Sequence, residues 1–168
     1  MYKRQAAIGN FAGTWCGCEG DTAALQLLEP AFEAIGARLF RIDAANKTLY
    51  HAASVIACNY LVALEELSLR TFEQAGVERQ LALQLLEPIL HGTVSNIVAQ
   101  GTSAALTGPI ARGDAGIVAR QLEALDSRDP EVSELYRRLG QIALGLAEMR
   151  AEAPMSNLAR IREILENR

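Results

Sequence analysis

The chain has 168 residues, of which 50% are hydrophobic and 21% charged, and its formal net charge is −4. This length and composition fit one soluble globular domain, or one domain with a fragment of another, and exclude an intrinsically disordered chain. The sequence has no cluster of Lys and Arg residues, so we expect no nucleic-acid partner. It has no uninterrupted run of about 18 apolar residues, so we expect no membrane-spanning helix and place the protein in the cytoplasm.

The sequence contains three cysteines, Cys16, Cys18 and Cys58. This number is small and odd, so it does not indicate a disulfide framework. Cys16 and Cys18 could offer two thiolates to a metal ion, with His51 or His91 as a third ligand. A structural zinc site usually has two spaced pairs of ligands, and the second pair is absent from this sequence. We therefore interpret the two neighbouring cysteines as reduced thiols on a strand and predict no metal site.

The first segment of the chain, residues 6–19, is rich in glycine and has the composition of a strand. No earlier segment could pair with it, and residues 1–5 do not lead into it. We therefore expect the chain to begin in the middle of a longer protein, with residues 1–5 foreign to it. A second short strand is expected over residues 39–42, just before Asp43.

The rest of the chain has the pattern of helices. Asp21 is expected to begin a helix that Gly36 ends, with a kink at Pro30. Apolar residues at helical spacing predict one long helix over residues 44–75, which Gly76 ends. Further helices are expected over residues 77–99, 114–125 and 130–149 and after Pro154, with a glycine-rich loop over residues 101–113. The pattern predicts a mostly α-helical fold of five to seven helices with a short strand-forming stub.

One candidate site lies on the long predicted helix. Lys47 and His51 are four residues apart and share a face of that helix, and Asn59 lies two further turns along. An ammonium, an imidazole and an amide on one side of a helix could bind and protonate a polar substrate. The structural alternative is a solvated Lys47 and an ordinary hydrogen-bonded His51, and the spacing alone favours that alternative.

A second candidate site lies in the predicted loop before the helix at residue 114. Glycines there let the backbone approach a ligand closely, and Arg112 could clamp a carboxylate or phosphate. Asp114 stands where a helix N-cap belongs. The alternative is turn and capping chemistry, with Arg112 and Asp114 paired for structural reasons. Composition leaves both alternatives open. If both candidate sites serve one substrate, they face the same cleft.

These stretches together resemble a known family. The segments that carry the resemblance occur in this order and at similar spacing: Phe11–Thr14, Glu19–Asp21, Lys47–Ala53, Cys58–Tyr60 and Leu106–Asp114. They resemble the C-terminal domain of bacterial proteins built as a Rossmann-like domain followed by a helical domain of unknown function. That family is similar in architecture to ketopantoate reductase, pyrroline-carboxylate reductase and the phosphogluconate and hydroxyisobutyrate dehydrogenases.

The resemblance implies a division of the chain and a cofactor. Residues 1–20 would be the remnant of the Rossmann-like domain, and residues 21–168 a helical C-terminal domain of the phosphogluconate-dehydrogenase type. The full-length protein would use NAD(P), whereas this chain lacks the glycine-rich nucleotide loop and is expected to bind none by itself. The helical domain would supply substrate contacts and form a homodimer.

The resemblance also implies a function. The full-length protein would be a reductase or dehydrogenase that transfers hydride to or from a small carbonyl or imine compound. This chain would be its substrate-binding and dimerisation half and would be inactive alone. Lys47 or His51 would be the acid/base, and which of the two is left open. The expected substrate-binding residues are Asn59, Asn96, Thr107, Arg112 and Asp114. The competing hypothesis is a non-enzymatic helical module for dimerisation or regulation, which long amphipathic helices fit equally well.

Overall fold

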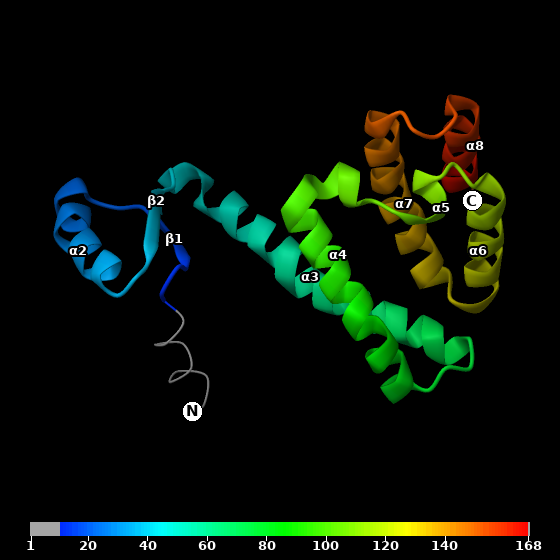
Figure 1. The fold of residues 1–168 in the computed structure, drawn as a ribbon, viewed down its shortest axis with the longest axis horizontal. Coiled ribbons are helices and arrows are strands. Elements are labelled where there is room, and N and C mark those ends of the chain that lie inside the picture. The colour runs from blue at the N-terminus through cyan, green and yellow to red at the C-terminus, as the bar shows by residue number, and fades with distance from the viewer. Residues whose placement is uncertain (1–10, 168) are drawn as a thin grey trace. The chain divides into compact units, whose positions relative to one another are not determined.

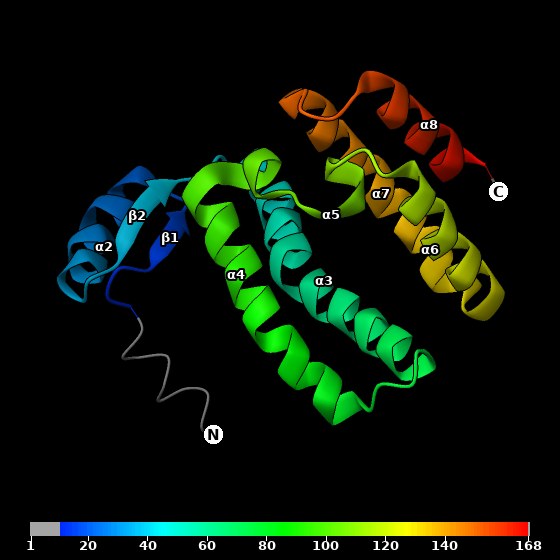
Figure 2. The ribbon, with the colours of Figure 1, turned by 45° about the vertical axis from the view of Figure 1, so that its right-hand side comes forward.

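A computed structural model of the chain describes residues 11–167. The chain divides into two compact units, Met1–Leu64 and Glu65–Arg168, and each is described here by itself. Figure 1 and Figure 2 show the elements of both units in chain order. Residues 6–10 of the expected first strand, and residues 1–5 expected to be foreign, lie outside the described part of the chain.

The first unit opens with a strand–helix–strand element. Strand β1 (Trp15–Cys18) is followed by helix α2 (Thr22–Ala34) and strand β2 (Arg38–Arg41). The two strands pair in parallel, with Trp15 opposite Arg38 and Cys18 opposite Arg41. The first strand therefore has a partner, which follows it in the chain instead of preceding it. The second strand, expected over residues 39–42, is present as β2 one residue earlier.

Aspartate side chains cap the first turns of helices in this unit by accepting nearby backbone N–H groups. The Asp21 carboxylate accepts the N–H groups of Ala23 and Ala24 at 3.0 Å, which begins α2 at the expected place. The helix continues through Pro30 without a break. After β2, a 3₁₀ turn η1 (Ala44–Asn46) leads directly into the long helix α3 (Lys47–Gln74).

Helix α3 spans the division between the two units, and little of it is buried. Within residues 11–167, the stretch Ala44–Gln74 is long and apolar enough to cross a membrane by length and composition alone. The sequence-based expectation considered only uninterrupted apolar runs, which Lys47, His51 and Asn59 break.

The second unit contains the end of α3 and five more helices: α4 (Arg79–Ala105), α5 (Gly108–Ala111), α6 (Ala115–Arg128), α7 (Pro130–Arg150) and α8 (Met155–Glu166). Residues 11–167 thus hold seven α-helices, within the expected number. The expected loop over residues 101–113 is wrong in its extent. The helical path of α4 breaks at Gly101, whose dihedrals are φ 80° and ψ 168°. A short helical segment then reaches Ala105, and α5 is helical as well.

The main core of the second unit lies between α5, α6, α7 and α8. Its fully buried apolar side chains are Val118, Leu144, Leu158, Ile161 and Leu165. A smaller apolar cluster joins the end of α3 to the start of α4 through Leu69, Ala82 and Leu86. Beyond this cluster, all residues of α4 from His91 to Gln100 are exposed. The second half of α4 is therefore almost uncovered within its own unit.

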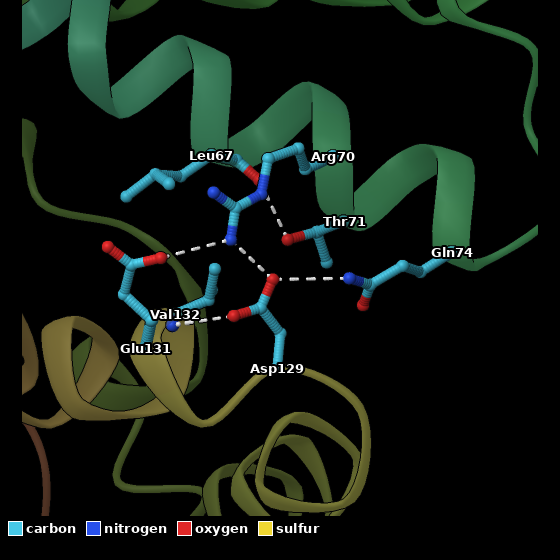
Figure 3. Close-up of polar contacts among 7 residues, drawn as sticks. All are labelled: Leu67, Arg70, Thr71, Gln74, Asp129, Glu131 and Val132. Atoms are coloured by element: carbon cyan, nitrogen blue, oxygen red, sulfur yellow. Dashed lines mark hydrogen bonds and ion pairs between the residues drawn. The ribbon is translucent and has the colours of Figure 1, made fainter.

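A polar cluster ties the end of α3 to the turn between α6 and α7 (Figure 3). The Arg70 guanidinium donates to Asp129 Oδ2 at 2.6 Å, and the Gln74 amide donates to the same oxygen at 3.2 Å. The other Asp129 oxygen accepts the N–H of Val132 and so caps α7. Arg70, the main cause, holds the pKa of Asp129 below its usual range. This cluster holds the last turns of α3, which belong to the second unit, against the start of α7.

Candidate functional site

Lys47 is held at the carboxyl end of strand β1. Its Nζ lies 2.5 Å from Oε1 of Glu19, the residue that directly follows the strand. In open sheets of parallel strands, ligands bind outside the carboxyl ends of the strands. The side chain of Lys47 is 65% exposed, so a ligand could reach it. Lys47 is thus both solvated, as the structural alternative expects, and ion-paired at the carboxyl end of a strand.

Aromatic packing fixes the first turns of α3 against the sheet. Phe40 on β2 makes edge contacts with Trp15 on β1, at a centroid distance of 6.3 Å, and with Tyr50 on α3, at 5.8 Å. The contact with Tyr50 orients the helix turn that carries both Lys47 and His51. The ion pair to Glu19 is therefore supported by packing on the adjacent turn.

His51 and Asn59 are both exposed, and within residues 11–167 their side chains make no hydrogen bond. The alternative of a hydrogen-bonded, structural His51 has no support in these contacts. Lys47, His51 and Asn59 all belong to the first unit, together with Glu19. The other four predicted site residues belong to the second unit.

Asn96 and Thr107 line one pocket of the second unit. Its volume is about 310 Å³, and its walls come from α4, the turn after it and Leu146 on α7. Asn96 and Thr102 present polar side chains in this pocket. Thr93 also lines it, but its hydroxyl already donates a hydrogen bond to the Ile89 carbonyl. The pocket therefore combines an apolar lining with a few polar groups, as small-molecule sites commonly do.

Arg112 and Asp114 line a different hollow of about 490 Å³, at the start of α6. The Asp114 Oδ1 accepts the N–H of Ile117 at 3.0 Å, so this carboxylate caps α6 as the structural alternative proposed. The Arg112 guanidinium pairs neither with Asp114 nor with any other residue in the range 11–167. The two residues thus have different roles: Asp114 caps a helix, whereas the Arg112 guanidinium has no partner among residues 11–167 and could bind a ligand.

Sequence reasoning missed three residues that the structure brings to these places. Glu19 is 28 positions from Lys47, and Asn157 and Arg160 on α8 join Arg112 in its hollow although they are far along the chain. No local pattern could pair them, because each contact depends on how separate elements pack.

The start of α2 does not fit the phosphates of a nucleotide cofactor. A nucleotide-binding strand–helix unit holds the pyrophosphate on a glycine-rich turn at the helix N-terminus. Here the Asp21 carboxylate already accepts the N–H groups of Ala23 and Ala24 at that end. These two N–H groups are therefore already engaged and would not hold a pyrophosphate.

The cysteines of the first strand form no metal site with their neighbours. Cys18 Sγ donates to the Phe40 carbonyl at 3.2 Å, and its next polar neighbour is Glu29 at 4.0 Å. Over residues 11–167, no three His, Cys, Asp or Glu side chains come close enough together to hold a metal ion.

Comparison with known proteins gives a family and a fold. Residues 14–143 match the model of the family described as "Domain of unknown function (DUF2520)". The crystal structure of protein TM1727 from Thermotoga maritima is 28% identical, with a TM-score of 0.77 over 88% of this chain and 58% of that one. The chain thus spans well under two thirds of that protein. No curated protein matches the chain.

A second solved structure shares the fold at lower identity. It is described as "putative NADP oxidoreductase BF3122" from Bacteroides fragilis and is 21% identical. The TM-score is 0.60 over 73% of this chain and 46% of that one. At this identity the likeness shows the fold alone, which agrees with the mostly helical architecture expected from the sequence.

Proposed function

The chain belongs to the DUF2520 family, and we propose that it is the substrate-binding and dimerisation half of a two-domain NAD(P)-dependent oxidoreductase. The observation that carries the proposal is the position of Lys47, paired with Glu19 at the carboxyl end of a parallel strand. The fold shared with a protein described as an NADP oxidoreductase supports it. The Rossmann-like part would include α2 and β2, and the nucleotide-binding turn would lie outside these 168 residues.

The acid/base of the reaction would be Lys47 or His51. Lys47 is held by Glu19, and its exposed ammonium can give a proton to a substrate oxygen or nitrogen. His51 stands one helix turn away on the same face, and its imidazole can serve the same role. Asn59 would orient the substrate. Glu19 acts through Lys47 and is a positioning residue.

The body of a small substrate would occupy the pocket between α4 and α7. Asn96 and Thr107 offer an amide and a hydroxyl there, against the apolar side chains of Ile97, Leu106 and Leu146. Arg112 would hold the anionic end of the substrate, and Asp114 would act indirectly by capping the helix next to it.

Dimerisation would bury the uncovered side of α4. Its exposed large apolar residues are Leu81, Leu83, Leu85, Ile89, Val94, Ile97 and Val98. Among these residues, Val94 and Val98 lie four residues apart on one face of the helix, and a partner could cover that face. The occupant we propose is a second copy of the chain, since symmetric homodimers are the commonest soluble assemblies.

The competing function, a non-enzymatic helical module, makes a different prediction about the gene. If the oxidoreductase proposal is right, the genomic sequence upstream of Met1 encodes, in the same reading frame, a strand followed by G-x-G-x-x-G. If Met1 is an authentic start codon and no such segment precedes it, the oxidoreductase proposal fails and the helical module takes its place.

A further inference from the structure

The arginines of the second unit fall into two groups. Residues 65–167 contain ten arginines and no lysine. Seven of them bond to a carboxylate or a backbone carbonyl: Arg70, Arg79, Arg128, Arg137, Arg138, Arg150 and Arg162. The remaining three, Arg112, Arg120 and Arg160, have no hydrogen bond or ion pair with any residue in the range 11–167.

These three arginines gather at one place. Arg112 and Arg160 line the same hollow of about 490 Å³ at the start of α6, although they come from different elements. Gly116 lines it as well, and Arg120 Nη1 lies 3.6 Å from where a Cβ on Gly116 would stand. Every unpaired arginine among residues 65–167 is thus in or beside this hollow.

The surrounding residues keep the hollow positive and open. Asp114 is the one acidic residue in its wall, and its Oδ1 is engaged with the N–H of Ile117. Asn157 on α8 adds an amide that could donate. Gly113 has φ +71°, and a Cβ there would lie 3.1 Å from the Cβ of Asn157, so a glycine lets the loop reach α8. The hollow therefore depends on a close approach of this loop to α8.

We propose that this hollow binds the phosphate group of a ligand. Guanidinium groups donate two parallel hydrogen bonds to phosphate oxygens, and two or three of them balance a dianion. The inference deepens the proposed function, since Arg112 would then hold a phosphate as the anionic end of the substrate, and Arg160, Arg120 and Asn157 would share that role.

Titration of the complete chain with inorganic phosphate, followed by ³¹P NMR at constant ionic strength set with chloride, tests the proposal. We expect saturable binding that weakens about tenfold or more in Arg112→Ala and in Arg160→Ala. Arg138→Ala removes an exposed guanidinium of α7 that is paired with Glu134, and should leave binding unchanged. Competition with glucose 6-phosphate and with NADP⁺ tells a substrate phosphate apart from a cofactor phosphate.

Gly116→Ala separates loss of the site from loss of the fold. The added methyl would make ordinary contacts of 3.6 and 3.7 Å with Arg120 and Asp114, and alanine favours the helix. We expect an equal or higher melting temperature and weaker phosphate binding. Absence of saturable phosphate binding, or equal binding in wild type, Arg112→Ala and Arg160→Ala, would overturn the inference. Neither result bears on proton transfer by Lys47 or His51, so the proposed function can fail or survive independently.

Discussion

Gly140 on α7 faces Leu165 on α8 so closely that a Cβ at residue 140 would lie 2.7 Å from Leu165 Cδ2. Both residues are buried in the main core of the second unit. Gly145 lies on the same helix, and a Cβ there would meet nothing within 4 Å. The two glycines are therefore a matched pair: one makes room for a neighbouring helix and the other does not.

This pair gives the first prediction. Gly140→Ala must displace Leu165 and should lower the free energy of unfolding by about 1–3 kcal/mol, as overpacked cores do. Gly145→Ala should raise it by roughly 0.5–1 kcal/mol, because alanine is the better helix former. Urea unfolding followed by circular dichroism measures both. Equal effects of the two substitutions would mean that α7 and α8 do not pack as described.

The second prediction concerns the two roles of Asp129. Asn at this position can still cap α7 but cannot pair its charge with Arg70, whereas Ala can do neither. We therefore expect melting temperatures to fall in the order wild type, Asp129→Asn, Asp129→Ala at neutral pH. In the Arg70→Ala background, Asp129→Asn should lower the melting temperature much less, since the charged partner of Asp129 is absent. The same cost in both backgrounds would rule out a coupling between these residues.

The third prediction concerns stability in acid. Hydrogen bonds from Arg137 and Ser133 lower the pKa of Asp126 from 3.8 to about 2. A carboxyl whose pKa is depressed by folding stabilises the protein fully above its unfolded pKa. That contribution is lost as the pH falls from about 3.8 through about 2. Stability measured across this window should therefore decline less steeply in Asp126→Asn than in the wild type.

A control for the acid prediction comes from the donors. Arg137→Ala should move the pKa of Asp126 toward its usual value, and Ser133→Ala should move it by less, because Arg137 is the larger cause. NMR titration of the Asp126 carboxyl follows both shifts. A normal Asp126 pKa in the wild-type protein would contradict the described hydrogen bonds.

The fourth prediction concerns association through α4. Val94 is 48% exposed and Val98 is 82% exposed, and the two lie four residues apart on one face of the helix. Sedimentation velocity at tens of micromolar should show the wild-type chain as a dimer or larger species, and the variant Val94→Glu/Val98→Glu as a smaller one. Met149→Glu changes an equally exposed apolar residue on α7, at 70%, and should leave association unchanged. A wild-type chain that sediments as a clean monomer would remove the basis for the proposed homodimer.

Local features of the fold were predictable from the sequence. Asp21, Asp114 and Asp129 accept hydrogen bonds from backbone N–H groups two or three residues later, so their capping role depends only on nearby residues. The extent of α4 was not predictable in the same way. Gly101 does leave the helical conformation, but the residues around it remain helical, so a glycine-rich segment marked a kink instead of a loop.

The pairing of β1 with β2 and most of the candidate site depend on contacts between distant residues. A strand does not show in its own sequence which later strand it will join, and Glu19 does not show that it will meet Lys47. The sequence did single out Lys47 and Arg112, because their side chains carry chemistry. It could not show that Arg112 would lie beside Arg160 and line a different hollow from Asn96.

The central claim is that this chain carries the proton donor of an NAD(P)-dependent oxidoreductase, and turnover of a full-length relative tests it most directly. In protein TM1727, NADPH oxidation should be measured with a panel of small carbonyl and imine compounds, before and after substitution of the residues aligned with Lys47 and His51. The account predicts that at least one of the two alanine variants loses turnover by about a hundredfold while NADPH affinity is unchanged. Unchanged turnover in both variants, or a full-length relative that does not bind NADPH, would contradict it.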